Sequence, residues 1–216
     1  MLSPKELDNI YTGKSGFVIG GGPSLKPYLN NEKVITFLQS NITIGCNRAY
    51  EFLTPSYTVV GDPWFSVFYR EQLEQLTCPL FLPDSTRKLQ KKDVYYLQRQ
   101  STAKPYVPLS FSQPISFTNN CGVLATRIAH LFGCNQLYLL GMDLHTTPEG
   151  THYHSGYPQP DRNASESRYR QFTEIFITTI KEMQEHGRII ISCSPTSPLN
   201  EIIPYEPLEE LVYRLG

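Results

Sequence analysis

The sequence predicts an α/β fold, in which a mainly parallel sheet is covered by helices on both faces. Short, continuously apolar runs alternate along the chain with longer amphipathic segments, as buried strands alternate with the helices that cover them. Glycine or proline follows most of the apolar runs. The 216 residues are enough for one domain with a sizeable core, and we expect residues 1–216 to form a single domain.

Seven apolar runs are predicted to be strands because they are short and are bounded by turn residues. We expect the fifth of them to lie nearest an edge of the sheet. In chain order the runs are residues 16–20, 41–46, 57–60, 79–82, 94–97, 137–140 and 188–192.

Amphipathic patterns predict the principal helices at residues 64–76, 120–132, 165–186 and 206–215. In the first of these, Trp64, Val67, Phe68 and Leu76 fall near one face. A further helix is expected after the glycines that follow the first strand.

Two long polar segments, residues 99–118 and 143–164, are predicted to be loops, and the first of them could act as a small lid.

Charge and composition exclude several functional classes. The formal charge is −1 and the sequence lacks the basic excess of a nucleic-acid-binding protein. No apolar run approaches the ~18 residues of a membrane span, and the N-terminal residues have no apolar core typical of a signal peptide. The five cysteines are odd in number and show no CxxC spacing, which indicates a reducing, cytoplasmic location and no zinc site.

A glycine-rich turn follows the first predicted strand, where parallel sheets bind ligands. It comprises Gly20, Gly21, Gly22, Pro23 and Ser24. Glycines allow a ligand to approach the backbone, and the amides at the start of the following helix would suit a phosphate. The turn matches neither GxGxxG nor a Walker loop. The alternative is a tight strand-to-helix turn without a ligand.

Polar residues follow other predicted strands or begin helices at the same edge of the sheet. They are Asn47, Asp62 and the segment Asn120, Cys121 and Gly122. Amide and carboxylate groups could bind a base, a ribose or a phosphate. The alternative for Asn47, Asp62 and Asn120 is helix capping, since asparagine and aspartate are favoured there.

Histidines and a carboxylate are concentrated after the strand 137–140, at Asp143, His145, His152, Tyr153 and His154. In an extended segment His152 and His154 share a side. With Asp143 they could bind a metal or act as acid and base near neutral pH. We expect a role in substrate handling and assign no metal; the alternative is a flexible polar loop.

Two serines follow the last predicted strand. The hydroxyls of Ser194 and Ser197 could hydrogen-bond a base or a phosphate. The alternative is a capping turn, because Ser194 precedes Pro195.

Taken in order, these motifs resemble one superfamily over residues 15–212. It joins the CMP-sialic-acid-dependent sialyltransferases of glycosyltransferase family 42, the motility accessory factors and the archaeal hydroxymethylpterin diphosphokinases. The motifs are residues 20–25, 46–50, 120–122, 139–144 and 193–197. Residues 150–156 and the Ser-Pro-x-Ser segment are most similar to an uncharacterised phage and bacterial branch.

The resemblance implies a Rossmann-like nucleotide-binding fold and roles for individual residues. The glycine-rich turn and Asn47 would hold CMP, while Asp62 and residues 120–122 would face the donor sugar and phosphate. Two tyrosines that assist the leaving phosphate in the family fall on His145 and near Tyr153. The family's histidine base falls near residues 169–170, which are Tyr and Arg here. His152 or His154 could replace it.

The function expected from these residues is transfer of a nonulosonic-acid-type sugar from a CMP-linked donor to an acceptor hydroxyl on a small molecule or glycan, with no cofactor. The starts of the helices at Ser24 and Asn120 would stabilise the leaving phosphate. One alternative is ATP-dependent diphosphate transfer, in which Asp62 and Asp143 would bind Mg²⁺. The other is a nucleotide-binding module without activity. The sequence predicts no oligomeric state.

Overall fold

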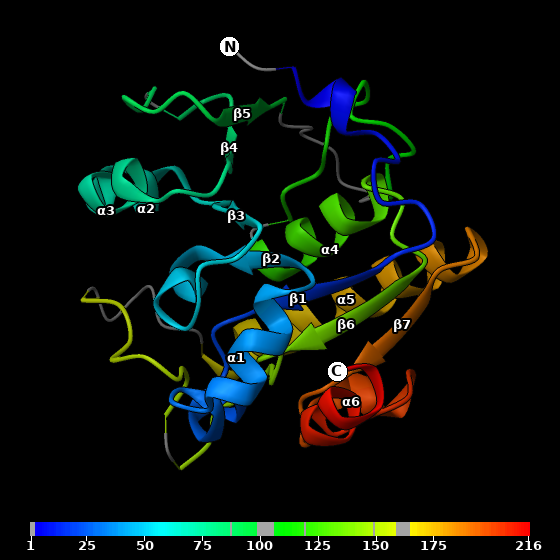
Figure 1. The fold of residues 1–216 in the computed structure, drawn as a ribbon. Helices are drawn as coiled ribbons and strands as arrows, with labels where there is room; N and C mark the ends of the chain where they lie inside the picture. The colour runs from blue at the N-terminus through cyan, green and yellow to red at the C-terminus, as the bar shows by residue number, and fades with distance from the viewer. Residues whose placement is uncertain (1–2, 87, 99–105, 119, 149, 159–164) are drawn as a thin grey trace.

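A computed structural model of the chain describes residues 3–86, 88–98, 106–118, 120–148, 150–158 and 165–216. Its centre is one seven-stranded, all-parallel sheet in the order β5-β4-β3-β2-β1-β6-β7 (Figure 1). The predicted α/β class is thereby confirmed, and β5 lies at an edge as expected. The strands are β1 Ser15–Ile19, β2 Ile42–Cys46, β3 Tyr57–Val59, β4 Leu80–Pro83, β5 Val94–Leu97, β6 Gln136–Leu140 and β7 Ile189–Ser192.

The strand order reverses at β1. Strands β2 to β5 extend the sheet on one side of β1, and the chain then returns to place β6 and β7 on the other side. The connection after β1 leads to a helix on one face of the sheet, and the connection after β6 leads to a helix on the other face. In open α/β sheets this switch point is where ligands bind.

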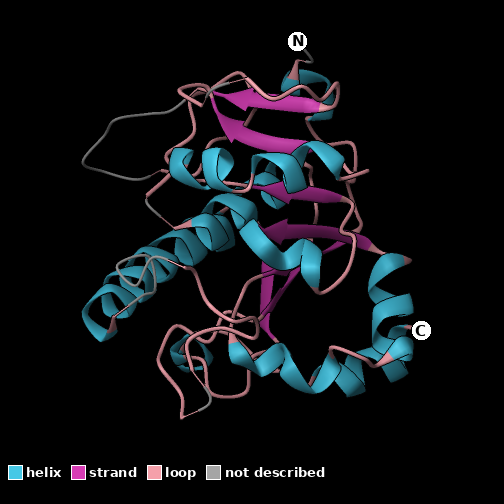
Figure 2. Cartoon of the chain, turned by 90° about the vertical axis from the view of Figure 1, so that its left-hand side faces the viewer, coloured by secondary structure: helices cyan, strands magenta, loops and turns pink. Residues whose placement is uncertain are grey.

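Helices cover both faces of the sheet (Figures 1 and 2). Helices α4 and α5 pack on the face that carries Val18, whereas α1 and α6 pack on the face that carries Phe17 and Ile19; α2 and α3 cover the β3–β4 part of this second face. The α-helices are α1 Glu32–Gln39, α2 Pro63–Phe68, α3 Arg70–Gln75, α4 Cys121–Leu131, α5 Glu166–Glu185 and α6 Leu208–Leu215. The short 3₁₀ helices are η1 Pro4–Leu7, η2 Pro23–Tyr28, η3 Asn47–Glu51 and η5 Pro198–Glu201.

The helix predicted at 64–76 is two short helices, which meet at Tyr69. Phe65, Tyr69 and Leu73, at i, i+4 and i+8, are its buried hydrophobic residues. Of the residues predicted to share a face, Trp64 and Leu76 are partly buried against them, whereas Val67 and Phe68 are 65% and 51% exposed. The segment carries two apolar stripes, and packing against β3 and β4 buries the one formed by Phe65, Tyr69 and Leu73.

The helix expected directly after the glycine-rich turn is also wrong. Residues 23–28 form the 3₁₀ helix η2, and α1 begins only at Glu32, with Asn31 as its N-cap. Pro27 lies inside η2 and has no N–H for the α-helical hydrogen bond. Ser24 is therefore not at the start of an α-helix.

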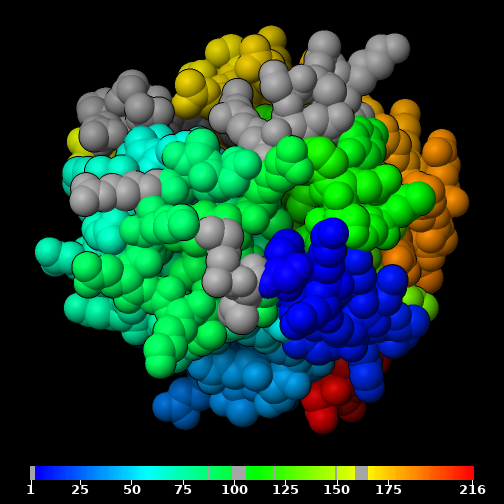
Figure 3. All heavy atoms as spheres, turned by 90° about the horizontal axis from the view of Figure 1, so that it is seen from above, coloured from blue at the N-terminus to red at the C-terminus, as the bar shows by residue number. Residues whose placement is uncertain are grey.

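The described part of the first long segment, residues 106–118, is packed into the core rather than forming a lid. It contains neither helix nor strand, but Phe111 and Ile115 are buried and the Phe111 ring stacks on Phe81. The Asp8 carboxylate accepts hydrogen bonds from the Ser110 hydroxyl and the Phe111 N–H, which fastens this segment to the N-terminal residues (Figure 3). Residues 99–105, and residues 159–164 of the second long loop, lie outside the described residues.

The helices in the described part of the chain are too short or too polar to cross a bilayer.

Candidate functional site

A cavity of about 590 Å³ lies at the carboxyl ends of the central strands. Its walls come from the segments after β1, β2, β3 and β6, the start of α4, the loop 150–158 and the first turns of α5. The lining residues are Gly20, Gly21, Gly22, Cys46, Asn47, Asp62, Trp64, Thr118, Asn120, Cys121, Gly122, Gly141, Met142, Asp143, Leu144, Thr151, His152, His154, Tyr157, Arg168, Tyr169, Gln171, Phe172 and Ile175.

The glycine-rich turn uses its amides to extend the sheet. The Gly20 N–H donates to the Leu140 carbonyl and the Gly22 N–H to the Gly141 carbonyl, both at 2.8 Å. The Ser24 N–H donates to the Asp143 carboxylate. The phosphate-binding role expected for these three amides therefore does not fit, because β6 and the turn after it already occupy them.

Close packing accounts for the glycines at positions 20 and 22. A Cβ atom on Gly22 would lie 1.7 Å from Oδ2 of Asp143, and one on Gly20 would lie 2.5 Å from the Gly141 carbonyl oxygen. A Cβ on Gly21 would instead approach the His152 ring at 3.2 Å. Gly20 and Gly22 thus bring the ends of β1 and β6 together, and Gly21 lies directly against the histidine segment, where its carbonyl accepts from the Tyr153 N–H.

Asp143 is a buried carboxyl at the edge of the cavity. Its Oδ2 accepts hydrogen bonds from the Ser24 hydroxyl at 2.9 Å and from the Ser24 N–H at 3.4 Å. Burial raises the pKa of Asp143 above its ordinary value, although the Ser24 hydrogen bonds oppose that shift. Ser24 and Pro23 do not line the cavity; Ser24 positions Asp143.

Ser194 and Ser197 do not reach the cavity either. The Ser194 hydroxyl accepts from the Met142 N–H at 2.9 Å, and the Ser197 hydroxyl donates to the Met142 carbonyl at 2.7 Å. Both serines are buried, and Ser197, not Ser194, caps η5. They hold the turn after β6 by binding the N–H and the carbonyl of Met142.

Asn47 presents an unpartnered acceptor at the cavity wall. Its Nδ2 donates to the Tyr157 hydroxyl at 3.4 Å, while its Oδ1 is buried and has no partner in the described part of the chain. Its backbone is left-handed, with φ +50°. Since buried polar atoms are almost always hydrogen-bonded, Oδ1 indicates a site for a ligand N–H or O–H.

The two capping alternatives for Asp62 and Asn120 have different outcomes. The Asn120 Oδ1 accepts from the Val123 N–H at 3.1 Å, so it does cap α4. This bond leaves its buried Nδ2 without a partner among the described residues. Asp62 is at the N-cap position of α2 but its side chain makes no capping hydrogen bond, and it lines the cavity. Cys121 and Gly122 open α4 at the same wall.

His152 and His154 lie together on the cavity wall, with stacked rings 4.7 Å apart. The His154 Nδ1 accepts from the Gly156 N–H, so neutral His154 carries its proton on Nε2. The His152 Nδ1 is 2.8 Å from the Thr151 hydroxyl. Burial above all lowers the pKa of His152 to about 4 and that of His154 to about 3. Both rings are therefore neutral at pH 7.

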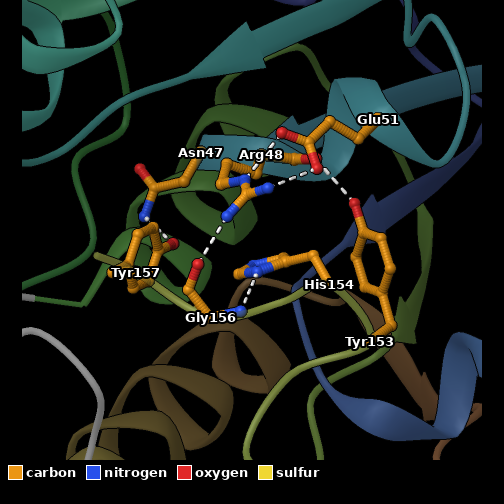
Figure 4. A network of polar contacts seen from close by, with 7 residues as sticks. All are labelled: Asn47, Arg48, Glu51, Tyr153, His154, Gly156 and Tyr157. Carbon is orange, nitrogen blue, oxygen red and sulfur yellow. Dashed lines mark hydrogen bonds and ion pairs between the residues drawn. The ribbon is translucent and has the colours of Figure 1, made fainter. Parts of the chain in front are cut away.

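Arg48 holds the histidine loop against η3 (Figure 4). Its Nη1 donates to the Gly156 carbonyl at 2.5 Å, and its Nε and Nη2 pair with both oxygens of Glu51. The Tyr153 hydroxyl donates to the Arg48 carbonyl at 2.6 Å. Tyr153 is buried on the far side of the loop and does not line the cavity, so the structure places it as a support and not as a ligand contact.

His145 also lies outside the cavity. Its Nδ1 donates to the Asp143 carbonyl at 2.7 Å, and its Nε2 is 3.3 Å from the Thr196 hydroxyl. The Nδ1 bond lies within the turn after β6, and the Nε2 contact connects that turn to the segment after β7. The position expected to assist a leaving phosphate has a bridging role instead.

The cavity residues that were not among the predicted site residues include Trp64, Tyr157, Arg168 and Tyr169. The Tyr169 hydroxyl donates to the Thr151 carbonyl at 3.3 Å, and burial raises the Tyr169 pKa to about 12. Tyr157 belongs to the same histidine- and tyrosine-rich segment as His152, and Tyr169 is where the resembled family has its base. Both signals were available in the sequence.

A metal centre finds no support in the described residues, which contain no group of three His, Cys, Asp or Glu side chains suited to hold an ion.

Comparisons of sequence find neither a protein family nor a curated protein that matches this chain. Comparisons of structure find the sialyltransferase CstII from Campylobacter jejuni in complex with the substrate analogue CMP-3FNeuAc, at 12% identity and TM-score 0.51, covering 90% of this chain and 86% of that one. The same enzyme with cytidine-5'-monophosphate matches at 15% identity and TM-score 0.53, covering 91% and 86%.

A third neighbour is the MAf glycosyltransferase from Magnetospirillum magneticum AMB-1, at 16% identity and TM-score 0.61. The match covers 97% of this chain but only 38% of that longer chain. Identities this low establish the fold and not the activity. The chain therefore has the Rossmann-like fold that these sialyltransferase and glycosyltransferase structures share.

Proposed function

We propose that this protein is a glycosyltransferase, which moves a nonulosonic-acid-type sugar from a CMP-linked donor to an acceptor hydroxyl. The observation that carries the proposal is the cavity at the β1–β6 switch point, with the unpartnered Asn47 Oδ1 in its wall. The fold is that of glycosyltransferases solved with CMP and a CMP-sugar analogue. An acceptor atom at this wall suits the amino or hydroxyl groups of a nucleoside.

Of the two helix starts expected to hold the donor phosphate, at Ser24 and at Asn120, we assign the one at Asn120. The amides of Gly20, Gly22 and Ser24 are occupied, whereas Cys121 and Gly122 open the 11-residue helix α4 at the cavity. The positive end of that helix favours an anion. The Nε2–H of His154 and the guanidinium of Arg168 lie on the same cavity, and both would donate hydrogen bonds to phosphate oxygens.

His152 is the proposed general base. When its Nδ1–H donates to the Thr151 hydroxyl, the Nε2 lone pair is available to the cavity. The acceptor oxygen attacks the anomeric carbon, its proton passes to Nε2 of His152, and the bond from the anomeric carbon to the phosphate oxygen breaks. The low pKa keeps His152 unprotonated beforehand, and the anionic donor would raise that pKa as the proton arrives.

No observation favours the diphosphokinase alternative. That reaction would need carboxylates available to Mg²⁺, and the Asp143 carboxyl is instead bound by the hydroxyl and N–H of Ser24.

Nucleotide binding tests the proposal. Purified protein is titrated with CMP, UMP, GMP and ATP, each with and without Mg²⁺, while thermal unfolding is followed. We expect CMP to stabilise the protein by about 2.7 kcal/mol at a hundredfold excess over Kd. The Asn47→Ala variant should lose that shift, because it removes the unpartnered acceptor.

The matched control is Asn31→Ala. Asn31 caps α1 through the Val34 N–H and does not line the cavity, so this variant should be less stable yet keep its response to CMP. If none of the four nucleotides shifts the unfolding temperature, the proposal is wrong. If CMP binds but a CMP-sugar is never turned over with a broad acceptor panel, the protein is a binding module.

A further inference from the structure

An apolar helix face lies exposed at the mouth of the cavity. Trp64, Val67 and Phe68 are spaced i, i+3 and i+4 on α2 and so share one face. Val67 is 65% exposed and Phe68 51% exposed, although both are large hydrophobic residues. We name this surface, Trp64–Val67–Phe68, the α2 face. Contiguous exposed apolar surface of this kind marks binding sites.

The α2 face is continuous with the cavity. Trp64 belongs to both, since it lines the cavity wall. Its ring lies 5.7 Å from that of Tyr157 in an edge-to-face arrangement and 6.5 Å from that of Phe68. Aromatic rings therefore run from the cavity wall, through Trp64, to the protein surface. A ligand that extends out of the cavity on this side would contact them in turn.

A carboxylate lies at the inner end of this surface. Asp62 is the N-cap residue of α2 and lines the cavity two residues before Trp64. A carboxylate has several acceptor positions and can bind hydroxyl groups beyond its existing contacts. Apolar rings beside a hydroxyl acceptor match the two chemical sides of a pyranose, which has a C–H face and a rim of hydroxyls.

We propose that the α2 face binds the acceptor saccharide, with the C–H face of a pyranose ring against Trp64 and Phe68 and its hydroxyls toward Asp62. The negative face of an aromatic ring attracts polarised C–H groups, and ligand sites combine aromatic walls with few polar groups. This proposal rests on the proposed glycosyl transfer, because it assigns the second substrate of the same cavity.

A protein partner fits the α2 face less well. Three side chains are far short of the ≈ 800 Å² per partner that a stable protein interface buries. Their connection to the cavity through Trp64 also has no use in an interface between two proteins. A saccharide that must place one hydroxyl inside the cavity needs such a connection.

The test uses a probe that the chain already contains. Trp64 is the only tryptophan in the sequence, so selective tryptophan excitation reports on this surface alone. The protein is titrated with CMP and, separately, with lactose, N-acetyllactosamine, N-acetylglucosamine, mannose and sialyllactose. We expect at least one saccharide to change the Trp64 emission saturably. Phe68→Ser should weaken the binding of that saccharide by about tenfold, because one aromatic contact is lost. The affinity for CMP should be unchanged.

The matched control is Tyr213→Ser. Tyr213 is an exposed aromatic residue on α6 and does not line the cavity, so this variant should bind the same saccharide as the wild type. Phe68 and Tyr213 are both exposed, so neither substitution should prevent folding.

The outcomes separate the two proposals. If CMP binds and no saccharide changes the Trp64 emission, or if Phe68→Ser binds saccharide as tightly as the wild type, the acceptor assignment is overturned and the proposed function stands. If CMP fails to bind, the proposed function falls. A wild-type dimer that Phe68→Ser converts to a monomer, without any saccharide response, would show that the α2 face binds a second copy instead.

Discussion

Replacing Gly22 with alanine tests why the glycine-rich turn contains glycine. If the glycines serve ligand approach, Gly22→Ala should weaken nucleotide binding and leave the fold intact. If they serve the packing of β1 against the turn after β6, the same change should destabilise the protein without any ligand. The structure favours the second explanation, because the Gly22 amide is already bound to the Gly141 carbonyl.

The size of the effect follows from the two nearest atoms. The new Cβ would lie 1.7 Å from Asp143 Oδ2 and 2.7 Å from the Gly141 carbonyl oxygen. Asp143 is only 3% exposed, so it cannot move into solvent without leaving Ser24. Losing hydrogen bonds to a carboxyl group removes about 1.5–3 kcal/mol, and overpacking adds about 1–3 kcal/mol. We expect the free energy of unfolding to fall by about 3–5 kcal/mol.

Urea unfolding of the unliganded protein measures this change. Gly21→Ala is the matched control, since its Cβ would come no closer than 3.2 Å to His152, and it should lose less than about 1 kcal/mol. The double variant Gly22→Ala/Asp143→Ala removes the shortest contact but keeps the one with Gly141, and should recover part of the loss. A Gly22→Ala protein as stable as Gly21→Ala would refute the reasoning.

Two further predictions concern the histidine pair. His152 and His154 have pKa values of about 4 and about 3 in the fold against about 6.5 unfolded, so the unfolded state binds protons first as pH falls below 6.5. The free energy of unfolding should therefore decrease as the pH is lowered from 6.5 to 4, by about 1.4 kcal/mol per pH unit for each histidine. If the variant His152→Asn/His154→Asn kept the same slope of stability against pH, this prediction would be contradicted. His152→Asn should lower kcat at least about a hundredfold with CMP affinity retained, and a normal kcat would remove His152 as the base.

The strands and the two long helices could be predicted from sequence because their signals are local. Residues buried on both faces must be apolar without interruption, and this pattern marks all seven strands to within one or two residues. The N-caps Asn120 and Ser165 and the apolar stripes behind them marked α4 and α5 in the same way. These features depend on neighbouring residues in the chain and not on distant contacts.

Part of the site could have been predicted and was not. An extended segment alternates its side chains, so the argument that puts His152 and His154 on one side puts Tyr153 on the other. The structure shows that arrangement: Tyr153 packs away from the cavity and supports Arg48. The period of two along an extended segment thus predicts the place of the tyrosine as well as the places of the histidines.

The sequence by itself determined the sheet, its parallel strands and the edge at which polar residues gather, because burial on two faces and turn chemistry are written into short segments. Only the tertiary structure decided what those polar residues do. Ser24, Ser194 and Ser197 became supports, since each hydroxyl found a partner on the turn after β6. Asn47 Oδ1 has no partner among the residues that the structure describes, and α2 presents Val67 and Phe68 to solvent. Contacts between segments far apart in the chain select among local patterns that are equally compatible with the sequence.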